Sequence, residues 1–181
     1  MKREDFEEAI RAERSASERT RTFASILASA SDAEMIIVGG SAIELYTGGD
    51  YVSGDIDLVT NDRRAITTVL RSWGFKDEAK LWTRGDLGLV VDAMQTRYPG
   101  DERAVRVLKG KFGPFRVAAP EDLLIGRLRE IRAQATTERQ AQALFAQSRT
   151  LVTFVGRETL DWQRLRWYAK REGWLDLLQQ V

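Results

Sequence analysis

The chain contains no cysteine and no histidine among its 181 residues, and only three prolines. The lack of cysteine excludes disulfides, thiol nucleophiles and thiolate zinc sites, and it is typical of cytoplasmic proteins. The lack of histidine excludes a Ser-His-Asp triad, an imidazole metal ligand and an imidazole general base. Acid-base chemistry in this chain therefore falls to carboxylates, lysine, tyrosine or metal-bound water.

Long hydrophobic runs are also missing. No apolar stretch reaches the roughly 18 residues that a membrane span needs, and the N-terminal residues 1–5 lack the apolar centre of a signal peptide. We therefore expect a cytoplasmic protein that does not engage a membrane. A composition of 43% hydrophobic and 30% charged residues is that of an ordinary globular chain. Its length allows one domain with an appendage.

Charge is distributed unevenly behind a formal net charge of +1. Residues 31–96 contain 6 basic and 11 acidic side chains, whereas residues 97–181 contain 16 basic and 10 acidic ones. The basic excess could face a polyphosphate or an RNA. Because it is spread over several elements, solvated helix faces explain it more simply.

The periodicity of apolar residues predicts helices and short strands in a definite order. Helices are expected over 4–29, 41–46, 63–72, from Pro120 onward, over 136–149 and over 158–180, with a break at Glu172-Gly173. Strands are expected over 35–38, 55–60, 79–83, 87–94, 104–108 and 114–118. This order indicates an α+β (α/β) core with an N-terminal helix over residues 1–118, and a helical part over 119–181 packed on that core.

A glycine turn and a pair of acids form the most informative motif. Gly39-Gly40-Ser41 follows an apolar strand and opens a helix, where glycines allow backbone amides to approach an anion and the serine adds a donor. Asp55 and Asp57 are two residues apart, so an extended strand would place both carboxylates on one face. Paired carboxylates that stay ionised usually hold a hard divalent cation such as magnesium. The lysine of a Walker loop and the dinucleotide fingerprint are both absent.

A third acid lies in the apolar run Leu89-Val90-Val91-Asp92-Ala93-Met94. Burying a lone carboxylate there would be costly, so Asp92 is expected either to pair with an arginine or to face a site. After the Asp-x-Asp strand, the metal interpretation gains weight, since a two-metal phosphoryl-transfer site draws more than two acids around its ions.

The glycine turn, the Asp55-Ile56-Asp57 strand and the later Asp92 together resemble the DNA polymerase β-like nucleotidyltransferase superfamily. The resemblance covers about residues 35–95 and implies a mixed sheet flanked by helices. It also implies that Gly39, Gly40 and Ser41 bind the triphosphate of an NTP substrate. Asp55, Asp57 and Asp92 would hold two magnesium ions, and Asp92 would deprotonate the acceptor hydroxyl.

Within that superfamily, the amino-acid sequence at residues 39–46 and 53–59 looks most like that of small prokaryotic members, which include relatives of abortive-infection AbiEii toxins. The expected activity is transfer of a nucleoside monophosphate from an NTP to an acceptor hydroxyl on tRNA, protein or a small molecule. One alternative is a non-catalytic binding protein of the same fold, such as a toxin-antitoxin component with a cognate partner. Another is a phosphate-releasing hydrolase that uses the same ions.

Other basic and aromatic residues carry weaker signals. Arginine and lysine at 76, 80, 84, 109 and 111 are expected to be exposed strand or turn residues rather than phosphate ligands. The C-terminal aromatics Trp162, Trp167, Tyr168 and Trp174 alternate with charges. Helix packing is favoured for them over a stacking surface for nucleic acid.

Overall fold

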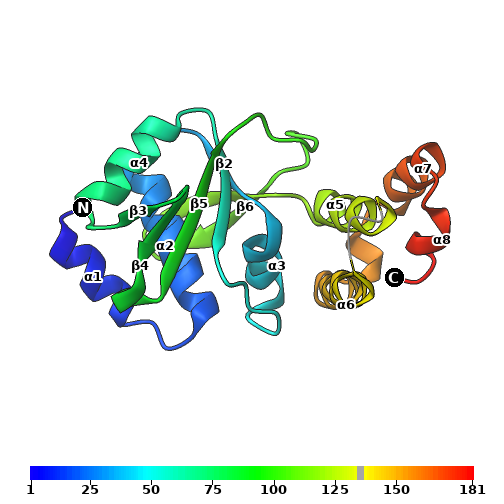
Figure 1. Cartoon of the computed structure of the whole chain (residues 1–181), viewed down its shortest axis with the longest axis horizontal. Coiled ribbons are helices and arrows are strands. Elements are labelled where there is room, and N and C mark those ends of the chain that lie inside the picture. The colour runs from blue at the N-terminus through cyan, green and yellow to red at the C-terminus, as the bar shows by residue number, and fades with distance from the viewer. Residues whose placement is uncertain (134–136) are drawn as a thin grey trace. The chain divides into compact units, whose positions relative to one another are not determined.

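A seven-stranded sheet organises the first of two units into which the chain divides (Figure 1). We call Met1–Ala118 the sheet unit and Ala119–Val181 the helical unit. The computed structural model describes residues 1–133 and 137–181, with residue 95 described by its backbone only. Within these ranges, no helix has the length and apolar character needed to span a membrane. The predicted start of a helix at residue 136 lies outside the described residues.

The sheet has the strand order β3-β4-β5-β2-β1-β7-β6. Its strands are β1 (Met35–Ile37), β2 (Ile56–Thr60), β3 (Lys76–Glu78), β4 (Leu81–Arg84), β5 (Leu89–Gln95), β6 (Arg106–Gly110) and β7 (Gly113–Val117). β1 pairs in parallel with β7, and β2 pairs in parallel with β5, while the other neighbours are antiparallel. The sheet is therefore mixed, as the sequence led us to expect.

Four helices accompany the sheet among the described residues of this unit. They are α1 (Arg3–Arg11), α2 (Ala16–Ala30), α3 (Gly39–Thr47) and α4 (Arg63–Ser72), with a short 3-10 helix η1 (Gly85–Leu87). The predicted single helix over 4–29 was wrong, because the chain breaks into α1 and α2. Ser15 begins α2 with a capping box in which Ser15 and Glu18 satisfy each other's backbone amides.

The hairpin of β3 and β4 also differs from the prediction of one strand over 79–83. Ala79 and Lys80 both have positive φ, at 50° and 97°, and they form the tight turn between two antiparallel strands. Two consecutive positive φ values match the twist of a hairpin. Neither residue is the glycine or asparagine that usually marks such a turn, so the turn could not be predicted from these residue types.

The two faces of the sheet differ in burial. Ile37, Leu58, Val91 and Val117 share one face by register and are each 0% exposed. α2 packs against β6 and β7, and α4 packs against β5, so helices supply the apolar layer. The opposite face carries Asp57 and is only partly covered. We call it the acid-bearing face.

An aromatic cluster fixes α1 to the sheet unit. The rings of Phe6 and Trp73 stack with centroids 4.3 Å apart and planes 6° apart, and Phe23 and Phe75 pack around them. All four side chains are at most 5% exposed. Burial of this much aromatic surface gives the unit a well-defined core.

Arg84 is not the exposed strand residue that the sequence predicted. Its side chain is 5% exposed and donates to the Trp73 carbonyl, to Glu7 at 2.6 Å and to Asp86 at 2.9 Å. Hydrogen bonds from this guanidinium lower the pKa of Asp86 from 3.8 to about 2. Arg84 thus joins α1, the end of α4 and η1. A buried arginine with this many acceptors has a structural role rather than a free charge.

The helical unit contains α5 (Pro120–Arg132), α6 (Glu138–Val155), η2 (Arg157–Thr159), α7 (Trp162–Glu172) and α8 (Leu175–Leu178). The predicted break at Glu172-Gly173 is confirmed, since Gly173 ends α7 in the left-handed conformation. The sequence placed a further helix over 158–180, but η2 and the cap residue Asp161 precede α7. α5 packs against both α6 and α7.

Candidate active site

The glycine turn lies where β1 ends and α3 begins. Gly39 has a φ of +59°, and a Cβ at this position would overlap the Asp57 carboxylate. A Cβ at Gly40 would lie 2.6 Å from the Ser53 hydroxyl and 3.1 Å from the Tyr51 hydroxyl. The turn is therefore flanked by an acid and by two hydroxyl groups. Glycine is favoured at both positions, because a larger residue would require these side chains to move, and at Gly39 the positive φ favours glycine as well.

Ser41 lies in the first turn of α3 and is 0% exposed. Its hydroxyl donates to the Val38 carbonyl at 3.0 Å and accepts from the Asp57 amide at 3.1 Å. The hydroxyl that the sequence assigned to a triphosphate is bound to backbone groups in this structure. Ser41 joins the end of β1 to β2 and so positions Asp57. The donors available to an anion at this turn are the first backbone amides of α3, which have no acceptor within the helix.

Asp57 and Asp92 are brought together by strand register. They are directly opposite each other on the parallel strands β2 and β5, which in a sheet lie about 4.8 Å apart. Since partners in register point to the same side, both carboxylates belong to the acid-bearing face. Each residue is half-buried. Two of the three predicted acids therefore form a neighbouring pair.

Asp55 lies one residue before the strand that was predicted to contain it. β2 begins at Ile56, one residue after Asp55, so strand alternation does not fix the direction of the Asp55 side chain. Ser53 Oγ lies 3.5 Å from Asp55 Oδ1, and both residues line a small cavity of about 40 Å³ together with Glu44. Asp55 thus reaches the glycine turn through Ser53. Within residues 1–133 and 137–181, no group of three or more acidic side chains is arranged to hold a metal ion.

Glu44 is a site residue that the sequence interpretation missed. Its side chain is 1% exposed, accepts from the Thr20 hydroxyl of α2 at 3.0 Å and accepts from the Ser53 amide at 2.6 Å. Glu44 therefore connects two helices to the loop that carries Ser53 and Asp55. The signal was present in the sequence, because Glu44 interrupts the apolar run Ala42-Ile43-Glu44-Leu45, as Asp92 interrupts its own strand.

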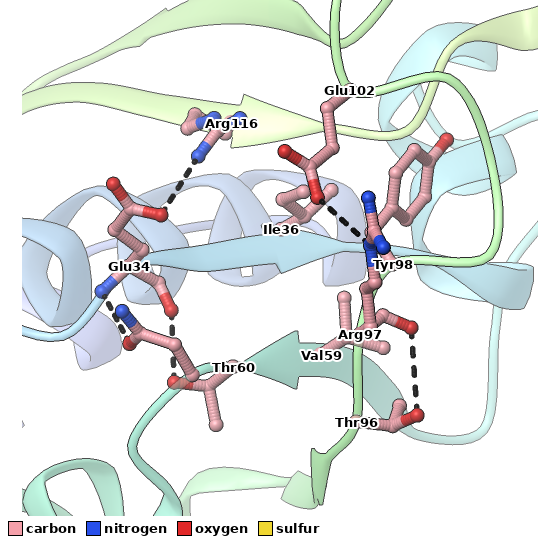
Figure 2. A pocket seen from close by; sticks show the side chains of 10 residues that line it. Glu34, Ile36, Val59, Thr60, Thr96, Arg97, Tyr98, Glu102 and Arg116 are labelled. Atoms are coloured by element: carbon pink, nitrogen blue, oxygen red, sulfur yellow. Dashed lines mark hydrogen bonds and ion pairs between the residues drawn. The ribbon is translucent and has the colours of Figure 1, made fainter.

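A larger cavity of about 390 Å³ opens on the same face of the sheet, further along the strands (Figure 2). Ile36 of β1 and Val59 of β2 form its floor, and Tyr98 closes one side. Val59 is two residues from Asp57, which corresponds to about 7 Å along a strand. The cavity and the acid pair are thus neighbours on one surface.

Two ion pairs border this cavity (Figure 2). Arg116 lies 3.7 Å from Glu34, and Arg97 lies 3.8 Å from Glu102. Thr60 donates to the Glu34 carbonyl at 2.8 Å, which fixes the rim where β2 ends. The cavity therefore combines an apolar floor with a polar border whose charges are paired. Such a lining suits a small polar molecule with an apolar or aromatic part.

The architecture is that of nucleotidyltransferase-like proteins, which confirms the fold class expected from the sequence. A crystal structure of an antigenic nucleotidyltransferase-like protein from Paracoccidioides brasiliensis superposes with a TM-score of 0.58 at 19% sequence identity. That superposition covers 76% of this chain and 77% of the other. The solution structure of the antibiotic-resistance factor ANT(2'')-Ia superposes with a TM-score of 0.55 at 15% identity, over 92% of this chain and 100% of the other. No protein-family profile matches the sequence, and no curated protein matches it.

The acid pair suits magnesium by the chemistry of its donors. Mg²⁺ is commonly bound through one or two carboxylates, with water and substrate phosphate oxygens completing its octahedron. Asp57 and Asp92 offer two such carboxylates beside a helix N-terminus that can bind phosphate. Asp55, the third predicted ligand, lies in the loop that Glu44 holds through the Ser53 amide.

Proposed function

We propose that this chain is a magnesium-dependent nucleotidyltransferase that moves a nucleoside monophosphate from an NTP to an acceptor hydroxyl. The observation that carries the proposal is the register pairing of Asp57 and Asp92 next to the Gly39-Gly40 turn. It combines a donor set for a hard cation with a phosphate-binding helix N-terminus. The likeness of the fold to nucleotidyltransferase-like proteins is consistent with this chemistry.

In this mechanism, the first amides of α3 bind the phosphates of the NTP, and Ser41 keeps the turn and Asp57 in register. Asp57 and Asp92 would hold magnesium, with Asp55 as the third expected ligand. When bound, magnesium would neutralise phosphate charge and lower the pKa of the acceptor hydroxyl. A carboxylate oxygen of Asp92 accepts the proton of that hydroxyl as the acceptor attacks the α-phosphorus. Pyrophosphate leaves, and histidine is not needed.

The cavity of Figure 2 provides space for a part of a substrate beyond the phosphates. Its volume of about 390 Å³ lies within the range of about 300–1,000 Å³ that is usual for small-molecule sites. Tyr98 supplies an aromatic wall, and Asn61 supplies a side-chain NH2 donor, while its side-chain oxygen accepts from the Glu34 amide at 3.0 Å. We propose that this cavity receives the nucleoside or a small acceptor. ANT(2'')-Ia, an antibiotic-resistance factor with this fold, makes a small molecule a reasonable acceptor to test.

The decisive experiment measures transfer of label from each α-labelled NTP, with magnesium, into tRNA, protein and small-molecule fractions. We expect Asp57→Asn to reduce transfer by more than about 100-fold, since even outer-shell partners of a metal cost up to about that factor. Asp77→Asn is the matched control, because Asp77 is an exposed carboxylate on the edge strand β3. It should transfer label at the wild-type rate.

The outcomes separate the alternatives. The proposal is supported if the Asp57→Asn variant loses label transfer and the Asp77→Asn variant keeps it. The labelled fraction then identifies the acceptor class. Release of phosphate or pyrophosphate without labelled acceptor would instead indicate a hydrolase. Wild-type protein that neither transfers label nor binds an NTP with magnesium would contradict the proposal.

A second candidate, a non-catalytic binding protein such as a toxin-antitoxin component, is favoured by two observations. Among the described residues no three acids are gathered for a metal, and the Ser41 hydroxyl is bound to backbone groups. If the wild-type chain binds no nucleotide, co-purification with a cognate partner protein becomes the experiment that tests this candidate. A cytoplasmic location stays a prediction in either case.

A further inference from the structure

One face of α7 in the helical unit exposes a large apolar ring among cations. Trp167 is 53% exposed, whereas Trp174 just beyond the helix is 1% exposed. Helical spacings of three and four residues place exposed polar and basic side chains on the same face as Trp167. We call this surface the α7 stripe, and it consists of Gln163, Arg166, Trp167, Lys170 and Arg171.

The indole ring of the stripe is held in place by its neighbours. The Arg171 guanidinium lies 4.5 Å from the Trp167 ring centroid and 5.6 Å from that of Tyr168. Trp167 and Tyr168 meet edge to face, with centroids 4.8 Å apart and planes at 89°. Packing was the expected role of Trp167, but these contacts orient the ring without burying it. An oriented and exposed indole offers a surface on which another flat ring can stack.

The positive charge of the stripe is only partly neutralised. Nearby arginines off the stripe are paired, because Arg164 contacts Asp122 and Arg129 makes a two-pronged contact with Glu172 at 2.6 Å. In contrast, neither Arg166 nor Lys170 makes an ion pair with any residue that the structure describes. The stripe therefore retains cations whose charge is available to a partner.

We propose that the α7 stripe binds single-stranded nucleic acid, with a base stacked on Trp167 and backbone phosphates on Arg166 and Lys170. Sequence-tolerant binders of single strands combine these two elements, an aromatic platform and a cationic track. An acidic protein surface would use the cations but would leave the exposed indole without a flat partner. The inference goes beyond the proposed transfer reaction and does not depend on it.

The test measures binding of labelled oligonucleotides of about 12 nucleotides, a length within the usual site size of such surfaces. Fluorescence anisotropy of oligo(U), oligo(A) and oligo(dT) with the full chain compares RNA with DNA. We expect Trp167→Ala to weaken binding by about tenfold or more for each strand that binds. Arg166→Gln combined with Lys170→Gln should also reduce the slope of log affinity against log salt by about 1.4, since two phosphate contacts are lost.

Matched controls keep the result specific to the stripe. Arg106 and Lys109 are two exposed cations on β6 of the sheet unit, so replacing both by Gln makes the same change of charge elsewhere. This double variant should bind oligonucleotides with the affinity of the wild type. Polyglutamate, a polyanion without bases, should bind weakly and without dependence on Trp167.

Several results would overturn the inference. One is that no oligonucleotide binds at low salt. Another is that a folded Trp167→Ala variant keeps the wild-type affinity. A third is that the Arg106 and Lys109 control loses as much affinity as the stripe variant. Polyglutamate binding that depends on Trp167 as strongly as oligonucleotide binding would assign the stripe to an acidic protein instead. Circular dichroism of each variant establishes that the chain is folded before binding is compared.

Discussion

The sheet unit buries both of its tryptophans, whereas the helical unit exposes one of its own. In the sheet unit, Trp73 and Trp82 are each 1% exposed, and Trp73 stacks on Phe6. In the helical unit, Trp174 is equally buried, but Trp167 is half exposed beside cations. Tryptophan therefore packs in the core of the sheet unit, whereas in the helical unit Trp167 presents a flat ring beside positive charge at the surface. Exposure, rather than composition, separates a packing aromatic from a binding one.

One arginine of each unit shows a similar contrast. Arg84 of the sheet unit is buried among Glu7, Asp86 and a backbone carbonyl. Arg166 of the helical unit is exposed on α7. The acid pair that we assign to chemistry lies in the sheet unit, and the cations that we assign to binding lie in the helical unit. Substitutions can therefore test the two roles separately.

The largest expected effect on stability is the loss of a buried aromatic. Trp73→Ala should lower the free energy of unfolding by about 3–5 kcal/mol, because it removes the partner of Phe6 and leaves a cavity. Trp167→Ala should change it by no more than about 0.5 kcal/mol, as for an ordinary surface substitution. Urea denaturation followed by circular dichroism measures both. Equal losses in the two variants would refute the contrast between a packing and a surface tryptophan.

A smaller effect is expected from the buried carboxylate that holds the site loop. Glu44→Ala leaves the Ser53 amide and the Thr20 hydroxyl without their acceptor, which should cost about 1–3 kcal/mol of stability. We expect the same variant to impair magnesium-dependent nucleotide binding, since Ser53 and Asp55 lose their support. Glu44→Gln retains one acceptor oxygen and should recover part of both properties. Nucleotide affinity unchanged in Glu44→Ala would show that the loop does not depend on this residue.

The smallest effects concern acid stability, and they differ between the units. Hydrogen bonds from Arg84 lower the pKa of Asp86 from 3.8 to about 2, and those from Arg129 lower the pKa of Glu172 from 4.5 to about 2. A carboxyl group whose pKa is lower in the folded state than in the unfolded state stabilises the fold at pH values above its unfolded-state pKa. This stabilisation is lost as the pH falls through the folded-state pKa. The Glu172 contribution should therefore begin to decline near pH 4.5, and that of Asp86 near pH 3.8.

Unfolding measured between pH 6 and pH 2 checks this order. Asp86→Asn and Glu172→Gln should each be less stable than the wild type at pH 6, and the differences should vanish near pH 2. Both carboxylates are partly exposed, so high salt should reduce the differences. A difference that stays constant down to pH 2 would mean that the substitution acts through packing rather than charge.

Much of the candidate site could be predicted from local sequence. The apolar run before Gly39 fixed a strand that ends in a tight turn, and an acid within an apolar strand drew attention to Asp92. Register could not be predicted, because the pairing of Asp57 with Asp92 depends on which strands become neighbours. The direction of the Asp55 side chain could not be predicted either, because β2 begins one residue after Asp55 and strand alternation does not fix it.

Other features required long-range structure. The cavity of Figure 2 forms because residues 96–102 return over Ile36 and Val59, which are distant in sequence. The break between α1 and α2 was missed although residues 11–22 are mostly polar and Ser15 and Glu18 carry a capping-box signal. Glu44 could have been found by the argument applied to Asp92. The hairpin turn at Ala79-Lys80 could not, since neither residue prefers positive φ.

The close approach of Gly39 to Asp57 has an evolutionary consequence. A Cβ at position 39 would occupy the space of the Asp57 carboxylate, so we expect the residues at the two positions to constrain each other. We expect a relative with a larger residue at position 39 to carry a shorter or redirected side chain at position 57, which would remove a ligand of the proposed metal. Alanine or serine at position 39 therefore marks the relatives in which the catalytic assignment should be withdrawn first.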